Sequence, residues 1–141
     1  MKKLLKDKIA LVIGASGDIG LAISKELISN GAKVILHYKK GNIKFKKFCK
    51  TNSTNILEEM KFDLLDSDHM DKVIKKKLYS KKYKINFLIN SAGFASGSIF
   101  EMTSISDIKK MFDINFFSQL RLIQLILRLM KNSKNASICN I

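Results

Sequence analysis

The sequence predicts an α/β fold, a doubly wound parallel sheet, in one domain spanning residues 1–141. Short apolar runs recur along the chain without polar alternation, which is typical of strands buried on both faces. Segments with helical periodicity separate these runs, as in repeated β-α-β units. The chain has no proline, and we find no repeat or Gly/Ser linker that would divide it.

The first half of the chain supplies two strands, their helices and the start of a third strand. KIALVIG (8–14) predicts a buried strand, and 19–32 predicts a helix that closes at Gly31. KVILHY (33–38) predicts the second strand, and 42–52 a weak basic helix. EMKFDL (59–64) predicts the third strand.

The second half continues the same alternation. We expect a helix over 67–83, opened by Ser67 or Asp68 as its cap, and a fourth strand with its turn over 85–93. Ser104 or Ser106 begins a long helix that reaches about Lys131. ASICNI (136–141) predicts a fifth strand, the last element of this Rossmann-type arrangement.

Composition excludes several classes of protein. The chain has 141 residues, of which 46% are hydrophobic, enough for an ordinary core. Cys49 and Cys139 lack partners at metal-ligand spacing, so we expect neither a disulfide framework nor a metal site. The apolar tract 114–130 carries two arginines and two glutamines, and the N-terminal apolar run is broken at 6–8. We therefore expect no membrane segment and a cytoplasmic location.

The net charge of +14 raises the alternative of nucleic-acid binding. Only Arg121 and Arg128 are arginines, whereas bidentate recognition of phosphates and bases usually favours arginine. Solvated lysines on helix faces therefore remain the favoured interpretation, and we expect no nucleic-acid partner. A basic field would still attract an anionic cofactor.

Three glycines follow the first predicted strand at equal spacing, in LVIGASGDIG (11–20). Glycine permits positive φ and close approach of a ligand, and the next helix would direct its N–H groups at a pyrophosphate. The strand before Gly14 and the helix after Gly20 favour nucleotide binding over a merely tight turn.

Five segments together resemble the short-chain dehydrogenase/reductase family, in family order and across the whole chain. GASGDIG resembles its glycine motif, FDLLD the Asp-hydrophobic pair after the third strand, and NSAG the turn after the fourth. FDIN resembles the helix segment with the catalytic asparagine, and ICNI the strand before the catalytic serine. The equal glycine spacing is closer to the longer, epimerase-like branch, but NSAG, FDIN and ICNI favour the single-domain ketoreductase branch.

The resemblance implies a role for each matching position. Asn115 would be catalytic, and the cofactor-binding residues would be Gly14, Ser16, Gly17, Asp18, Ile19, Gly20, Tyr38, Lys39, Asp63, Leu64, Asn90, Ser91, Ala92 and Gly93. Asp63 and Leu64 would hold the adenine, and residues 90–93 would line the nicotinamide side. Taken singly, Asp63 could also be a turn residue and Asn115 an interior helix residue.

Two positions depart from the family motif, and a third bears on cofactor choice. Ile13 stands in place of Thr, and Asp18 in place of the middle glycine, where a carboxylate repels pyrophosphate unless it turns outward. After the second strand no carboxylate is available for a ribose 2′-hydroxyl, while Lys39 follows Tyr38 directly. We therefore expect NADP(H) rather than NAD(H), with His37 and His69 as surface residues.

The family's catalytic Tyr-x-x-x-Lys is not found in this sequence. Its tyrosines, Tyr38, Tyr79 and Tyr83, are followed four positions later by Asn42, Tyr83 and Phe87. The resemblance implies reduction of a 3-oxoacyl or other ketone, with the chain cut at the fifth strand and inactive alone. A non-catalytic nucleotide-binding or partner-binding module is the alternative. We also expect a homo-oligomer that associates through the 104–131 helix.

Overall fold

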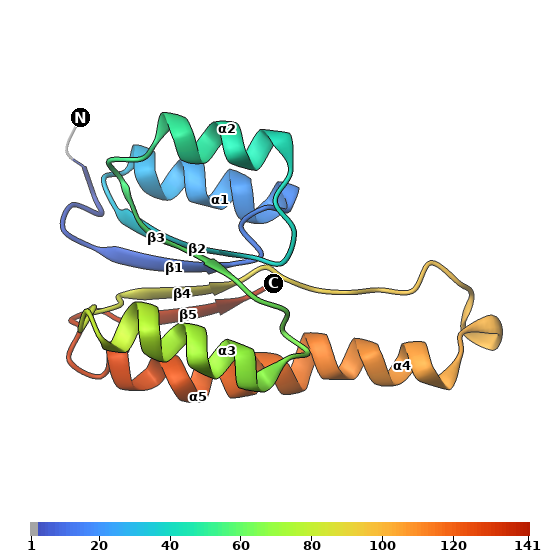
Figure 1. Cartoon of the computed structure of the whole chain (residues 1–141). Helices are drawn as coiled ribbons and strands as arrows, with labels where there is room; N and C mark the ends of the chain where they lie inside the picture. The colour runs from blue at the N-terminus through green and yellow to red at the C-terminus, as the bar shows by residue number, and fades with distance from the viewer. Residues whose placement is uncertain (1–2) are drawn as a thin grey trace.

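The computed structural model describes residues 3–141 and confirms the predicted doubly wound α/β fold. Its five strands form one parallel sheet in the order β3-β2-β1-β4-β5, with helices on both faces (Figure 1). Met1 and Lys2, which begin the predicted domain, lie outside the described residues. Among the described residues, no helix has the length and apolarity needed to cross a membrane.

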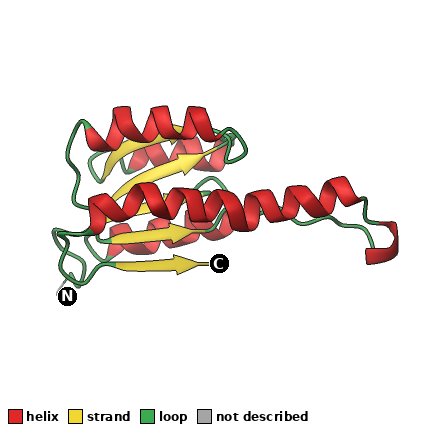
Figure 2. Ribbon diagram, turned by 90° about the horizontal axis from the view of Figure 1, so that it is seen from below, coloured by secondary structure: helices red, strands yellow, loops and turns green. Residues whose placement is uncertain are grey.

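The elements alternate along the chain as β-α units. Their bounds are β1 Ile9–Ile13, α1 Asp18–Ser29, β2 Lys33–Tyr38, α2 Ile43–Thr51, β3 Ile56–Lys61, α3 Ser67–Ile74, β4 Phe87–Asn90, α4 Ile105–Phe112, α5 Ser118–Met130 and β5 Ser137–Asn140. Helices α1 and α2 cover one face of the sheet, and α3 and α5 cover the other. Helix α4 and the loop before it extend beyond the sheet (Figure 2).

Each face of the sheet packs its own apolar core, because the strand residues alternate between the two helical layers. Leu11, Ile35 and Leu88 pack with residues of α3 and α5, such as Ile126. On the opposite face the core contains Ala10, Val12, Val34, Leu36 and Phe45. Strands β1, β2 and β4 are therefore buried on both sides, as their continuous apolar sequences indicate, whereas the edge strand β5 is mostly exposed.

The prediction of the third strand at 59–64 is wrong in its bounds, because the strand lies at Ile56–Lys61. The start of the strand at Ile56 cannot be predicted from the apolar pattern, because Glu58 and Glu59 interrupt the apolar run. Glu58 is nevertheless buried. Irregular pairing with β2 at Val34 and Ile35 also shifts the register. The strand ends before Asp63, whose Oδ1 accepts the Leu65 N–H at 3.1 Å and starts a turn.

Several predicted helix boundaries also change. Asp66, rather than Ser67 or Asp68, caps α3, because its side chain accepts the His69 N–H at 3.0 Å. Helix α3 ends at Ile74 and continues only through a π-helical turn at Lys75–Tyr79, short of residue 83. Helix α1 is likewise shorter than predicted and ends at Ser29.

The predicted long helix has three parts. Helix α4 is capped by Ser104, a π-helical turn follows at Asp113–Phe117, and α5 continues to Met130. The fourth strand occupies Phe87–Asn90 within the predicted 85–93. Strands β1 and β4 lie side by side, with Ile13 opposite Asn90, so the chain segments that leave them meet at the switch point of the sheet.

Candidate functional site

The glycine turn between β1 and α1 packs directly against the segment that leaves β4. Gly14 has φ +80°, and a Cβ there would lie 2.8 Å from the backbone of Ala92. A Cβ on Gly20 would overlap the Gly14 carbonyl oxygen and come within 2.7 Å of Ser91 Oγ. These two positions therefore require glycine for backbone packing.

Gly17 differs from the other two glycines because its surroundings are open. A Cβ at Gly17 would approach only the Gly14 carbonyl oxygen, at 3.4 Å, and its φ of −76° suits any residue. Gly17 is the N-cap of the 12-residue helix α1 and provides no side-chain cap. The first N–H groups of α1 thus lack a side-chain acceptor and face the turn, where the helix dipole favours an anion.

Three hydrogen bonds from neighbouring elements hold the turn in place. The Ala15 N–H donates to the His37 carbonyl at 2.9 Å, and the Gly14 N–H donates to His37 Nδ1 at 3.3 Å. Asn42, the cap of α2, donates from Nδ2 to the Ser16 carbonyl at 2.9 Å. The turn is therefore built before any ligand arrives, which lowers the cost of binding.

A hollow of about 340 Å³ opens beside the turn, at the carboxyl ends of the strands. Nine of the predicted cofactor-binding residues line it: Gly14, Ser16, Gly17, Lys39, Asp63, Leu64, Ser91, Ala92 and Gly93. His37, Lys40, Phe94, Lys110 and Ile114 complete its wall. The structure therefore brings together residues from segments that are far apart in the sequence.

The charges in this hollow favour an anionic ligand. Its wall contains three lysines, Lys39, Lys40 and Lys110, and one carboxylate, that of Asp63. Lys39 Nζ lies 2.5 Å from Asp63 Oδ2, and Lys110 Nζ lies 4.4 Å from the centroid of the Phe94 ring. Burial opposes ionisation of Asp63, but hydrogen bonds from Lys39 and the Leu65 N–H outweigh it, so its pKa lies below the ordinary value.

The remaining predicted cofactor-binding residues of the glycine turn and β2 lie outside the hollow. Asp18 points into solvent with 93% of its side chain exposed and pairs with Lys44 at 3.7 Å, so its carboxylate turns away from the turn. Ile19 is exposed, and Gly20 is buried beneath the turn. Tyr38 packs its ring against Phe45, with ring centroids 4.9 Å apart.

Asn90 and Asn115 belong to a second hollow of about 590 Å³ that shares residues 92–94 with the first. Asn115 lies in the π-helical turn, and its side chain both accepts the Phe94 N–H and donates to the Phe94 carbonyl, each at 2.8 Å. Asn90 donates to Asn140 at 2.7 Å. Asn115 thereby fixes the loop at the junction of the two hollows.

Gln119 adds a polar group to this mostly apolar second hollow. Its Nε2 donates to the Ala92 carbonyl at 2.9 Å. Within residues 3–141, its Oε1 and the Oδ1 of Asn90 are buried and have no hydrogen-bond partner. Phe94, Phe116 and other apolar side chains form most of the remaining wall together with Asn115 and Asn140, so the hollow is largely apolar with a few amide side chains.

His37 is predicted to be a surface residue, and this prediction is wrong. The side chain is buried, because strand β2 lies between β1 and β3 and its end is covered by the glycine turn and Phe62. His69 is exposed on α3, as predicted. Lys110 and Gln119 are not among the predicted site residues. Gln119 lies four residues after Asn115, and that helical spacing is the signal that the sequence offers for it.

Comparison with known proteins gives a consistent match. Residues 8–141 match the family model described as short chain dehydrogenase. A protein of Helicobacter pylori named a probable short-chain type dehydrogenase/reductase is 31% identical over 133 residues, covering 94% of this chain and 47% of that protein. An NADPH-dependent 3-dehydrocapnine reductase of Ornithobacterium rhinotracheale is 28% identical, covering 92% of this chain and 45% of that protein.

Solved structures show the same fold. The NADPH-bound carbonyl reductase from chicken fatty liver superposes with a TM-score of 0.84 at 22% identity, covering 97% of this chain and 57% of that one. The chain thus spans about half the length of the relatives that it matches.

Proposed function

This chain belongs to the short-chain dehydrogenase family, and from that membership we propose that it binds NADP(H) for an oxidoreductase acting on a carbonyl/alcohol pair. The main support for this proposal is the hollow of about 340 Å³, which is lined by the glycine turn and by Lys39, Lys40 and Lys110. An uncapped helix N-terminus and three ammonium groups match a dinucleotide that carries an additional phosphate.

The residues present fit the cofactor at each of its parts. Gly17 leaves room for the pyrophosphate at the start of α1, because this position carries no side chain and its surroundings are open. Lys39 and Lys40 would hold the ribose 2′-phosphate, and Asp63 with Leu64 would hold the adenine, since all four residues line this hollow. The name of the Ornithobacterium relative, an NADPH-dependent reductase, supports the same choice of cofactor.

The second hollow is the proposed substrate side. NADPH, when bound, supplies the hydride for reduction of the carbonyl. Residues 92–94 line both hollows, and Asn115 holds this shared segment through both of its hydrogen bonds to Phe94. The apolar wall suits the hydrocarbon part of a ketone or a 3-oxoacyl group.

Proton donation is the part of the reaction that residues 1–141 do not provide. None of the three tyrosines is followed by lysine four residues later. We therefore expect residues 1–141 by themselves to bind NADPH without reducing a ketone. A nucleotide-binding module without catalysis is the second candidate, favoured by the same observation. Both candidates predict no turnover by residues 1–141 alone, so ketone reduction assayed on the protein purified from its native cell distinguishes the two.

The test of cofactor binding is Gly17→Asp, because this position separates binding from folding. An aspartate at the N-cap accepts the free N–H groups of α1, so thermal stability should be unchanged or higher. Its carboxylate occupies the place proposed for the pyrophosphate, and NADPH affinity, measured by calorimetric titration, should fall about tenfold or more.

The matched control is Gly97→Asp, which introduces the same charge at a glycine where an added Cβ would have no other atom within 4 Å. It should bind NADPH as the unsubstituted chain does. Equal affinity of Gly17→Asp and the unsubstituted chain would contradict the proposed site. Salt-sensitive DNA or RNA binding that ignores Gly17→Asp would instead favour the nucleic-acid alternative.

A further inference from the structure

His37 is the one histidine of two in this chain that is buried, with 2% of its surface exposed at the end of β2. It belongs to the wall of the hollow proposed for NADP(H). Its ring forms hydrogen bonds with the segments that follow both neighbouring strands of the sheet. One is the glycine turn after β1, and the other is Phe62 after β3.

The two hydrogen bonds of the ring determine where its proton lies. The Gly14 N–H can only donate, so Nδ1 of His37 must be the unprotonated acceptor, at 3.3 Å. The Phe62 carbonyl can only accept, so Nε2 carries the proton and donates, at 3.1 Å. The imidazole is therefore neutral, with its proton on Nε2.

Packing and burial keep the ring in this state. The His37 ring lies against the Phe62 ring with centroids 3.9 Å apart. Burial lowers the pKa of His37 to about 4, although the hydrogen bond to the Phe62 carbonyl and the charge of Asp63 act in the opposite direction. An imidazolium would have no lone pair for Gly14, so the neutral form is needed for the contact with the turn.

We propose that His37 is a positioning residue for the dinucleotide, which fixes the distance between the glycine turn and the segment carrying Asp63. Gly14 begins the turn proposed for the pyrophosphate, and Phe62 immediately precedes the residue proposed for the adenine. One rigid ring joins the two by hydrogen bonds to their backbones. This inference rests on the proposed binding of NADP(H).

A purely structural role for the ring is the competing explanation, and three variants distinguish it. In His37→Asn the amide oxygen takes the place of Nδ1 and keeps the acceptor for Gly14, whereas in His37→Gln the amide nitrogen takes the place of Nε2 and keeps the donor for Phe62. His37→Phe retains the buried ring and loses both hydrogen bonds.

The experiment measures NADPH affinity and thermal midpoint for these three variants, with the exposed His69→Asn as control. His37→Phe should weaken NADPH binding about tenfold, because it loses both hydrogen bonds of the bridge. His37→Asn and His37→Gln, which each lose one of the two, should weaken it about fivefold, while His69→Asn stays within about twofold. A structural role alone would lower the thermal midpoints and leave NADPH affinity unchanged in every variant that folds.

Nitrogen-detected NMR of the unsubstituted chain provides a readout that does not depend on the folding of any His37 variant. The His37 ring, assigned as the signal that remains in the exposed control His69→Asn, should show a protonated Nε2 and a bare Nδ1 at neutral pH, and NADPH should shift it. A protonated Nδ1, or NADPH affinity in His37→Phe equal to that of the unsubstituted chain, overturns the inference alone. No NADPH binding by the unsubstituted chain overturns the proposed function and this inference together.

Discussion

Lys39 and Lys40 are adjacent in sequence but differ in what holds them. Lys39 Nζ pairs with Asp63 Oδ2 at 2.5 Å, which fixes the ammonium at the edge of the hollow and occupies one oxygen of Asp63. Lys40 lines the same hollow and has no ion pair with a carboxylate among residues 3–141. A 2′-phosphate would therefore lie near two ammonium groups, that of Lys39, which is held by Asp63, and that of Lys40, which is free to pair with the phosphate.

Replacing Lys40 should change the choice of cofactor. In Lys40→Gln we expect NADPH affinity to fall about tenfold, because one charge-assisted hydrogen bond to the 2′-phosphate is lost. NADH affinity should stay the same, because NADH lacks that phosphate. Parallel titrations with both nucleotides test this, with Lys72→Gln on the distant helix α3 as control. An equal loss for NADH and NADPH would contradict a role in reading the 2′-phosphate.

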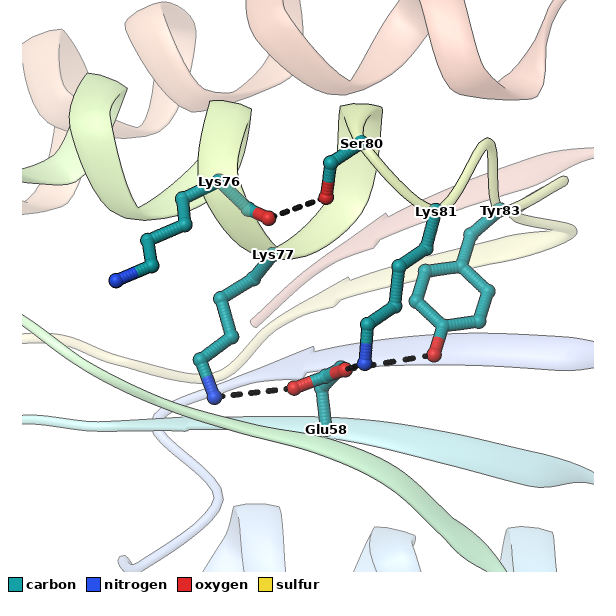
Figure 3. Close-up of polar contacts among 6 residues, drawn as sticks. All are labelled: Glu58, Lys76, Lys77, Ser80, Lys81 and Tyr83. Atoms are coloured by element: carbon teal, nitrogen blue, oxygen red, sulfur yellow. Dashed lines mark hydrogen bonds and ion pairs between the residues drawn. The ribbon is translucent and has the colours of Figure 1, made fainter.

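At the scale of the element, Glu58 connects β3 to the segment that follows α3. Its carboxylate, with 7% of the side chain exposed, pairs with Lys77 at 3.0 Å and also with Lys81 (Figure 3). Tyr83 donates to it at 3.5 Å. Burial opposes ionisation of Glu58, but the two lysines outweigh it, so its pKa lies below the ordinary value. The π-helical turn Lys75–Tyr79 supplies Lys77.

Glu58→Gln should lower the free energy of unfolding by about 1 kcal/mol at neutral pH, because a neutral amide cannot pair with Lys77 and Lys81, whose exposed ammonium groups are already partly screened by solvent. The folded-state pKa lies below the unfolded value of 4.5, so the contribution is present above that pH and is lost as pH falls through the folded value. Denaturant unfolding between about pH 7 and 3 measures both effects.

The control for this prediction is Glu59→Gln. Glu59 is the exposed neighbour of Glu58 on the same strand, and its side chain points to the other face of the sheet. We expect this control to change the free energy of unfolding by less than about 0.5 kcal/mol. A similar loss in both variants would contradict the assignment of the stability to the buried carboxylate.

The same strand shows how far sequence patterns predict elements. Strands β1 and β2 are predictable from sequence, because burial on both faces requires a continuous apolar run. The glycine turn is predictable because its glycines directly follow such a run. The predicted bounds of strand β3 are wrong because its buried Glu58 is stabilised by lysines about twenty residues away in the sequence. His37 is missed for a similar reason, since its partners Gly14 and Phe62 are neighbours only after the sheet forms.

At the scale of the whole molecule, apolar side chains are exposed along α4, α5 and the π-helical turn between them. Phe112, Phe116, Phe117, Leu120 and Leu127 expose between 46% and 59% of their surface. Exposed apolar residues that adjoin one another are typical of a protein–protein interface. The 104–131 region predicted to associate is therefore apolar on its outer side.

We expect residues 1–141 to self-associate through this surface. The double variant Phe117→Lys/Leu127→Lys places two charges on this surface, at positions that do not line the second hollow, and should shift the particle mass toward that of one chain. Sedimentation velocity over a range of concentrations measures the mass. Ile43→Lys is the matched control, since Ile43 is 85% exposed on α2, across the sheet from α5 (Figure 1). A single-chain mass for the unsubstituted protein at about 100 μM, well above the Kd of a stable dimer, would contradict association through α4 and α5.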